Sequence, residues 1–79
     1  MELRHIRYFK AVAEEKNFTR AAEKLAIAQP PLSRQIQDLE AELGTSLFVR
    51  TPHKVTLTEE GELFLQYATQ ILDLVNRSE

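Results

Sequence analysis

Glutamine, serine and arginine side chains gather near two adjacent prolines in one helical segment of the chain. This segment, residues 26–43, reads AIAQPPLSRQIQDLEAEL. Glutamine and arginine match the hydrogen-bonding edges of adenine and guanine in the major groove, and a serine hydroxyl can donate to a phosphate. These residue types therefore indicate recognition of duplex DNA. The residues concerned are Gln29, Pro30, Ser33, Arg34 and Gln37.

The same segment has the periodicity of an amphipathic helix. Pro30 and Pro31 are acceptable in a first helical turn, whose N–H groups have no intrahelical acceptor, so they fix the start of the helix. Gly44 stands where a helix commonly ends in a left-handed residue. One stripe of about 60° is predicted to face the core, opposite Pro30, Ser33, Arg34 and Gln37. The stripe consists of Leu32, Ile36, Leu39 and Leu43.

Charge along the chain is uneven. The formal net charge is −2, which argues against a protein that binds polyanions over its whole surface. Residues 1–54, however, carry nine basic and seven acidic residues (9 − 7 = +2), whereas residues 55–79 carry one and five (1 − 5 = −4). Asp38, Glu40 and Glu42 lie at the end of the proline-started helix, so its N-terminal end is expected to approach DNA.

The remaining elements build a small helical domain with a hairpin. Apolar residues at three- and four-residue steps predict a helix over 3–15, and Asn17 can cap a second, short helix. A β-hairpin is expected next, and Thr58 can cap the last helix. The predicted ranges are 18–25 for the second helix, 47–50 and 54–57 for the two strands and 59–77 for the last helix.

The last helix has more apolar residues than one buried face requires. One stripe can cover the domain core while another remains available for a second chain, as in a coiled-coil seam. The alternative is that all of this surface belongs to the core. The residues expected at the seam between two chains are Phe64, Ala68, Ile71 and Val75.

Composition limits the other chemistries. A chain of 79 residues without cysteine forms one small domain and can hold neither disulfides nor thiolate-bound metal. His5 and His53 are too far apart in sequence for a local metal site, and Ser33 has no adjacent base. No signal peptide or membrane-spanning run is visible, which favours a cytoplasmic protein. We therefore expect no catalytic residues, metal or cofactor.

Two helices joined by a tight turn and followed by a hairpin make a mainly α, winged helix-turn-helix fold: a three-helix core, a short two-stranded wing and a long linker helix. In its motifs and their spacing, the sequence resembles the DNA-binding domain of the LysR-type transcriptional regulators. The motifs that carry the resemblance, in the order and spacing of that family, are LRHIRYFKAVAEEKNFTRAAEKL, AQPPLSRQIQDLEAELGTSLFVR and LTEEG. Three positions depart from its usual residues: Ala28, the His53–Lys54 pair and Glu60.

The resemblance implies a homodimer that binds a pseudo-palindromic operator on double-stranded DNA for transcriptional regulation, with RNA polymerase as a further candidate partner and no membrane partner. Residues 1–58 would form the DNA-binding domain and 59–79 the linker and dimerisation helix. A C-terminal domain that binds a small-molecule effector would follow outside this chain. The residues expected to read bases are Gln29, Pro30, Ser33 and Arg34. The residues expected to hold the DNA backbone are Thr19, Arg20, Gln37, Arg50 and Thr51. The residues expected in the wing contact are Pro52, His53 and Lys54.

Other interpretations stand beside these. Gln29 and Arg34 could solvate a helix surface, and Arg50 could pair with a carboxylate of its own domain. A helical protein-interaction module would explain the acidic balance but would leave the face around Ser33 and Arg34 unused. A small enzyme would need a converging acid, base or metal constellation, and none is visible in the sequence.

Overall fold

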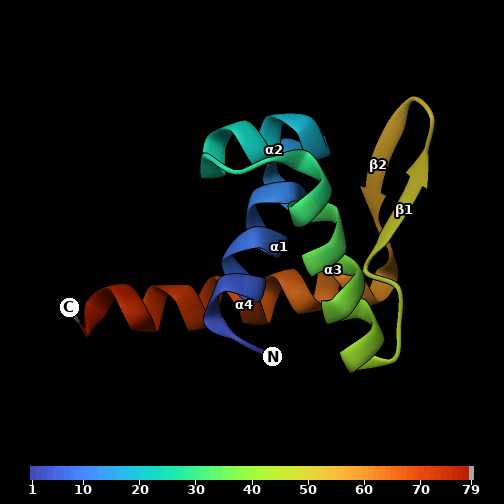
Figure 1. Ribbon diagram of the computed structural model, residues 1–79. Helices are drawn as coiled ribbons and strands as arrows, with labels where there is room; N and C mark the ends of the chain where they lie inside the picture. The colour runs from blue at the N-terminus through green and yellow to red at the C-terminus, as the bar shows by residue number, and fades with distance from the viewer. Residues whose placement is uncertain (79) are drawn as a thin grey trace.

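The computed structural model describes residues 1–78 and contains, in that range, helices and one β-hairpin around a single core (Figure 1). The fold predicted from the sequence is confirmed. The elements are α1 (Leu3–Glu15), α2 (Phe18–Leu25), α3 (Gln29–Leu43), β1 (Phe48–Thr51), β2 (Lys54–Leu57) and α4 (Glu59–Arg77).

Helices α1 and α2 have the predicted bounds and pack against each other. The Asn17 side chain caps α2 by accepting a hydrogen bond from the Arg20 N–H at 2.9 Å. Ala21 and Ala22 are buried, and their small side chains allow the helices to approach closely. The α2–α3 turn begins at Ala26, which has a left-handed φ of 59°.

Helix α3 begins one residue before Pro30 and ends at Leu43, and its C-cap residue, Gly44, has the left-handed φ of 72° expected there. Its N-cap residue, Ala28, makes no side-chain cap bond, so the prolines define the start of the helix without that help. Leu32, Ile36 and Leu39 are fully buried as predicted. The prediction is wrong for Leu43, which is 37% exposed because the helix ends there, beyond the body of the core.

The hairpin projects from the helical core as the wing. Its strands are antiparallel, with Phe48 opposite Leu57 and Thr51 opposite Lys54. The first strand therefore lies one residue later than expected, because Leu47 turns into the core and Thr51 joins the ladder.

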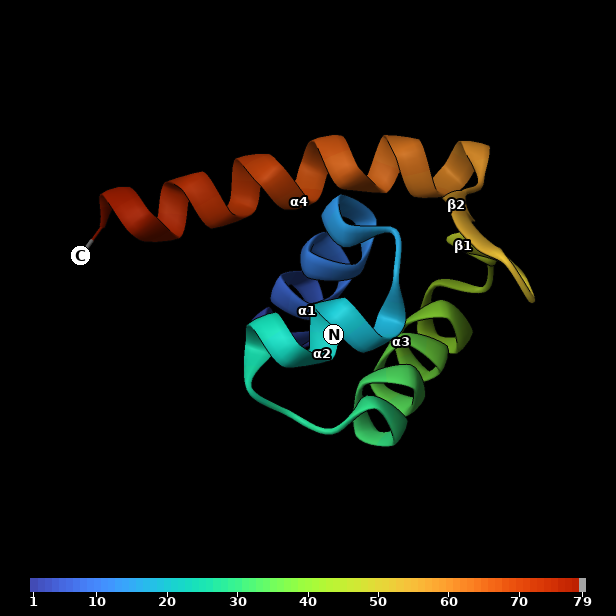
Figure 2. The same cartoon turned by 90° about the horizontal axis from the view of Figure 1, so that it is seen from above.

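Helix α4 crosses the bundle and extends beyond it at its C-terminal end, as both views show (Figures 1 and 2). Thr58 caps it by accepting from the Gly61 N–H at 2.9 Å, and its hydroxyl also donates to the Ser46 carbonyl at 2.7 Å. Within residues 1–78, no helix is long and apolar enough to cross a lipid bilayer.

The structure corrects the predicted face of α4. Ala68 was expected to be free for a second chain, but it is fully buried in the core of its own chain, and Phe64 and Ile71 pack against that core. Val75 is half-buried. The reason is that α4 turns this stripe towards α1, so the apolar side chains left in solvent lie about a quarter-turn away around the helix.

Gly61 allows α4 to lie against the segment that leads into the wing. A Cβ at this position would overlap the backbone carbonyl of Leu47, which cannot move aside as a flexible side chain would. The close approach therefore requires glycine.

We expect Gly61→Ala to lower the free energy of unfolding by about 2 kcal/mol, because overpacking outweighs the gain in helix propensity of about 1 kcal/mol. Urea unfolding measures the difference. Gly44→Ala is the matched control: it has open space but a left-handed φ, and should cost about 1 kcal/mol. A Gly61→Ala protein as stable as the unsubstituted chain would contradict the packing argument.

Candidate nucleic-acid interface

The N-terminal end of α3 presents a polar surface to solvent. Pro30, Arg34 and Gln37 are exposed, and Gln29 and Ser33 are half-buried. The fully buried Leu32 and Ile36 hold the opposite side of the helix in the core. The four residues predicted opposite the core stripe of α3, namely Pro30, Ser33, Arg34 and Gln37, therefore do lie on its accessible side.

An arginine of the wing joins this face. The Arg50 Nη1 atom donates to the Ser33 hydroxyl oxygen at 2.8 Å. The Arg50 guanidinium also lies over the Phe18 ring, 4.0 Å from its centroid, at a distance typical of a cation–π contact. Arg50 thus connects β1, α2 and α3, and its partner within the chain is a hydroxyl group instead of the carboxylate considered above.

A small cleft separates the wing from the α1–α2 turn. Its volume is about 230 Å³, and its lining includes Lys16, Thr19, His53 and Lys54. Lys16 was not predicted as a site residue. Only the tertiary arrangement of this turn and the wing brings Lys16 to the same cleft as His53 and Lys54, so no local pattern in the sequence could have identified it.

The other predicted residues lie at the edges of the same surface. Thr19 and Arg20 are exposed in the first turn of α2. The Thr51 hydroxyl donates to the Lys54 carbonyl at 3.1 Å and closes the wing turn, in which Pro52 and His53 are exposed. In Figure 1 the wing tip, α2 and the start of α3 lie at one end of the molecule, while α4 crosses the other end.

The ion pairs leave this surface positively charged. Arg4, Lys10, Lys24 and Arg77 each lie within 4 Å of a carboxylate, all on other parts of the surface. Among the cations of residues 1–78, those expected at DNA take part in no ion pair. They are Arg20, Arg34, Arg50 and Lys54.

The carboxylates of α3 are kept from the cationic end, and one of them has a structural partner. The Glu40 carboxylate accepts hydrogen bonds from the Leu47 and Phe48 N–H groups, at 2.7 and 3.2 Å. It therefore faces the segment that enters the wing. Asp38 and Glu42 are exposed in the C-terminal half of the helix.

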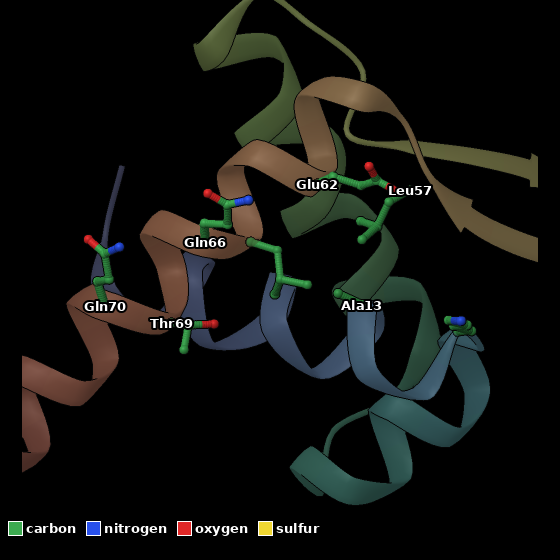
Figure 3. Close-up of a pocket in the computed structure, with 8 residues that line it drawn as sticks. Ala13, Leu57, Glu62, Gln66, Thr69 and Gln70 are labelled. Carbon is green, nitrogen blue, oxygen red and sulfur yellow. The ribbon is translucent and has the colours of Figure 1, made fainter.

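A second depression, of about 740 Å³, opens between α1 and α4 (Figure 3). Glu62, Gln66 and Gln70 are spaced along α4 and do not converge on one point. The depression offers one carboxylate, one lysine and no histidine or cysteine, which makes no acid–base pair or nucleophile site. Within residues 1–78, no group of three His, Asp or Glu side chains could hold a metal ion.

Residues 3–62 match the sequence pattern of a family described as "Bacterial regulatory helix-turn-helix protein, lysR family". The chain belongs to the LysR family. The resemblance predicted from the sequence is confirmed, since these residues are most of the chain and include α1, α2, α3 and the wing.

Named relatives in the LysR family are transcriptional regulators. The chain is 60% identical to BenM of Acinetobacter baylyi over 77 residues, which are 98% of this chain and 25% of BenM. It is 58% identical to CatR of Pseudomonas putida over 79 residues, covering 100% of this chain and 27% of CatR. The chain thus spans about a quarter of the length of these regulators, and their names describe no enzyme.

Solved LysR structures agree with the fold. The DNA-binding domain of BenM in complex with the catB site 1 DNA has a TM-score of 0.96 and 59% identity, covering 99% of this chain and 87% of that one. Full-length CbnR complexed with its target DNA has a TM-score of 0.94 and 47% identity, covering 99% of this chain and 27% of that one.

Glu40 is expected to hold the entry to the wing. We expect Glu40→Ala to lower the free energy of unfolding by about 1–2 kcal/mol, because two backbone N–H groups lose a charged acceptor. Glu40→Gln, which keeps an acceptor oxygen, should lose less. Thermal and urea unfolding measure both, with Asp38→Ala as the exposed control, which should change stability by less than about 0.5 kcal/mol. Equal effects of Glu40→Ala and Asp38→Ala would contradict this role.

Proposed function

We propose that this chain binds double-stranded DNA in a sequence-specific manner, through the N-terminal end of α3 and the wing, and thereby regulates transcription. The observation that carries the proposal is that Arg20, Arg34, Arg50 and Lys54, at one end of the molecule, take part in no ion pair within residues 1–78. Phosphate groups are the natural partners of such cations. BenM and CbnR, relatives of the same fold, are each solved in complex with DNA, which supports DNA binding by this chain.

Base reading is assigned to the exposed polar residues of α3. An arginine can donate two hydrogen bonds to one guanine, and glutamine can do the same with adenine. Arg34 stands one turn into the helix with no ion-pair partner within residues 1–78, so its guanidinium is available for a base edge. The residues proposed to read bases are Gln29, Pro30, Ser33 and Arg34.

Contacts with the DNA backbone are assigned to the residues around the N-terminal end of α3. Arg50 is oriented by Phe18 and Ser33, and its remaining N–H groups can donate to a phosphate. Lys16 joins this group because it borders the cleft beside the wing. Besides Lys16, the residues proposed for backbone contact are Thr19, Arg20, Gln37, Arg50 and Thr51, with Pro52, His53 and Lys54 in the wing.

The assembly proposed is a homodimer in which residues 1–58 bind DNA and residues 59–79 form the linker and dimerisation helix. A two-fold dimer presents two reading helices, so its operator would be a pseudo-palindrome. In the whole protein, a further domain would bind a small-molecule effector, and RNA polymerase would be a partner at the promoter. Because its DNA site would lie on the chromosome, the protein would act in the cytoplasm.

Arg34→Ala should reduce discrimination more than general affinity. We expect it to cost roughly 1–3 kcal/mol of binding free energy on the specific site and much less on random duplex, because a base contact is lost. Fluorescence anisotropy with both duplexes, over a series of salt concentrations, measures this. Equal losses on the two duplexes, with an unchanged melting temperature, would show that Arg34 only grips the backbone.

Arg50→Ala is the matched comparison. It should weaken specific and random binding about equally and lower the salt slope by about one unit, as expected for one lost phosphate contact. Arg50→Lys keeps the charge but loses the planar stacking on Phe18. Compared with Arg50→Ala, it should recover most of the salt slope but only part of the binding affinity. Binding that does not depend on salt for any of these proteins would contradict DNA binding and favour a protein-interaction module.

A further inference from the structure

An aromatic side chain supports one of the cations proposed to contact DNA. The Cζ atom of Arg50 lies 4.0 Å from the centroid of the Phe18 ring, and the Nη1 atom donates to the Ser33 hydroxyl oxygen at 2.8 Å. Arg50 is exposed, and an exposed arginine ordinarily samples many rotamers. These two contacts instead hold its side chain in one position, where β1, α2 and α3 meet.

The Phe18 ring is itself firmly held. It is 7% exposed and meets the Phe48 ring edge to face, with the ring centroids 5.9 Å apart. Phe48 in turn lies 5.2 Å from Phe9, and Phe9 lies 4.9 Å from Phe64, again between ring centroids. All four phenylalanines of the chain thus form one continuous series of rings, from α4 through α1 and β1 to α2. A ring supported in this way gives Arg50 a fixed surface to lie on.

The contact with the ring leaves the guanidinium able to bind an anion. Arginine carries several N–H donors, and Ser33 accepts from one of its nitrogen atoms. The attraction to the Phe18 ring draws on the positive charge and uses no N–H group in a hydrogen bond. Within residues 1–78, Arg50 also takes part in no ion pair. Phe18 therefore fixes the place of the cation without occupying the donors that a phosphate needs.

We propose that Phe18 is a positioning residue for DNA binding: before DNA arrives, its ring holds the Arg50 guanidinium where a backbone phosphate will lie. An arginine that is already ordered loses less conformational entropy on binding, so this preorganisation adds to the affinity. The proposal rests on the phosphate contact assigned to Arg50 above. It gives a buried side chain of the core a share in the affinity for DNA.

The competing role of Phe18 is to fill the core and nothing more. Phe9 provides the matched comparison, because it belongs to the same series of rings and is fully buried, but Phe48 and Phe18 separate it from Arg50. Phe18→Leu and Phe9→Leu remove the same atoms from the core. If both rings only stabilised the fold, the two substitutions would act on DNA binding alike.

Proton NMR of the chain without DNA tests the positioning itself. An aromatic ring shifts protons that lie above its face to higher field, so the Hδ and Hε protons of Arg50 should resonate upfield of ordinary arginine values. Phe18→Leu should remove this shift, whereas Phe18→Tyr, which keeps a ring, and Phe9→Leu should retain it. Ordinary resonance positions of Arg50 in the unsubstituted chain would overturn the proposal, and that measurement needs neither a substitution nor DNA.

Fluorescence anisotropy with the specific duplex tests the effect on binding, at a temperature where circular dichroism shows each variant folded. Phe18→Leu should weaken binding about threefold with the salt slope nearly unchanged, because the cation is still present but no longer ordered. Phe18→Tyr should bind like the unsubstituted chain, and Phe9→Leu should change affinity less than Phe18→Leu does. In a chain that already carries Arg50→Ala, Phe18→Leu should cause no further loss, since it acts through Arg50. Phe18→Met takes the place of Phe18→Leu if the leucine variant does not fold.

Three results would contradict the proposal in different ways. Additive losses from Phe18→Leu and Arg50→Ala would show that Phe18 does not act through Arg50. Equal losses from Phe18→Leu and Phe9→Leu would leave Phe18 as a core residue only. An unsubstituted chain that shows the ring shift of Arg50 but no salt-dependent DNA binding would overturn the proposed function, and the role of Phe18 in binding with it.

Discussion

The contacts that α3 and α4 make with the short segment from Ser46 to Phe48 determine how the helices and the wing are arranged. The Glu40 carboxylate of α3 accepts from the Leu47 and Phe48 N–H groups, the Thr58 hydroxyl donates to the Ser46 carbonyl, and Gly61 lies against the Leu47 carbonyl. One extended stretch of backbone is thus held by α3 on one side and by the start of α4 on the other. Its polar groups would otherwise be buried without partners, at a substantial cost in free energy.

Holding this segment also fixes the wing relative to the helices. Phe48 begins β1 and packs against Phe9 and Phe18, with ring centroids 5.2 and 5.9 Å away. Two residues later, Arg50 lies over the outer side of Phe18 and reaches Ser33 on α3. The aromatic core therefore continues directly into the polar surface proposed to contact DNA, and a shift of the wing would move the Arg50 guanidinium away from α3.

The same packing divides the surface of the molecule into two ends with different properties. Ala68 and Leu72 of α4 complete the core over α1, which turns Leu63, Tyr67 and Leu74 outwards. Glu59, Glu60 and Glu62 lie at the start of α4. Within residues 1–78, the arginine and lysine residues around the start of α3 and in the wing take part in no ion pair. A protein with a slightly acidic total charge can in this way keep one cationic end while acidic and exposed apolar side chains gather along α4.

The sequence by itself determined the local structure and the family of this protein. Apolar periodicity, the Asn17 and Thr58 caps, the adjacent prolines and Gly44 predicted the bounds of the helices closely, because these signals act within a few residues of one another. The motifs of α2 and α3 likewise predicted the winged helix-turn-helix and the polar reading face. Which residues of that face contact bases remains a prediction.

Only the tertiary structure decided which apolar side chains remain outside. Leu43 and Ala68 both fit the predicted patterns, yet Leu43 is partly exposed and Ala68 is fully buried, because burial depends on how far a helix extends past its neighbours and how it is rotated against them. The positions of Lys16 beside the wing and of Arg50 between Phe18 and Ser33 depend on contacts between elements distant in sequence. Periodicity identifies the faces of a helix, but packing against the other elements selects the face that is buried.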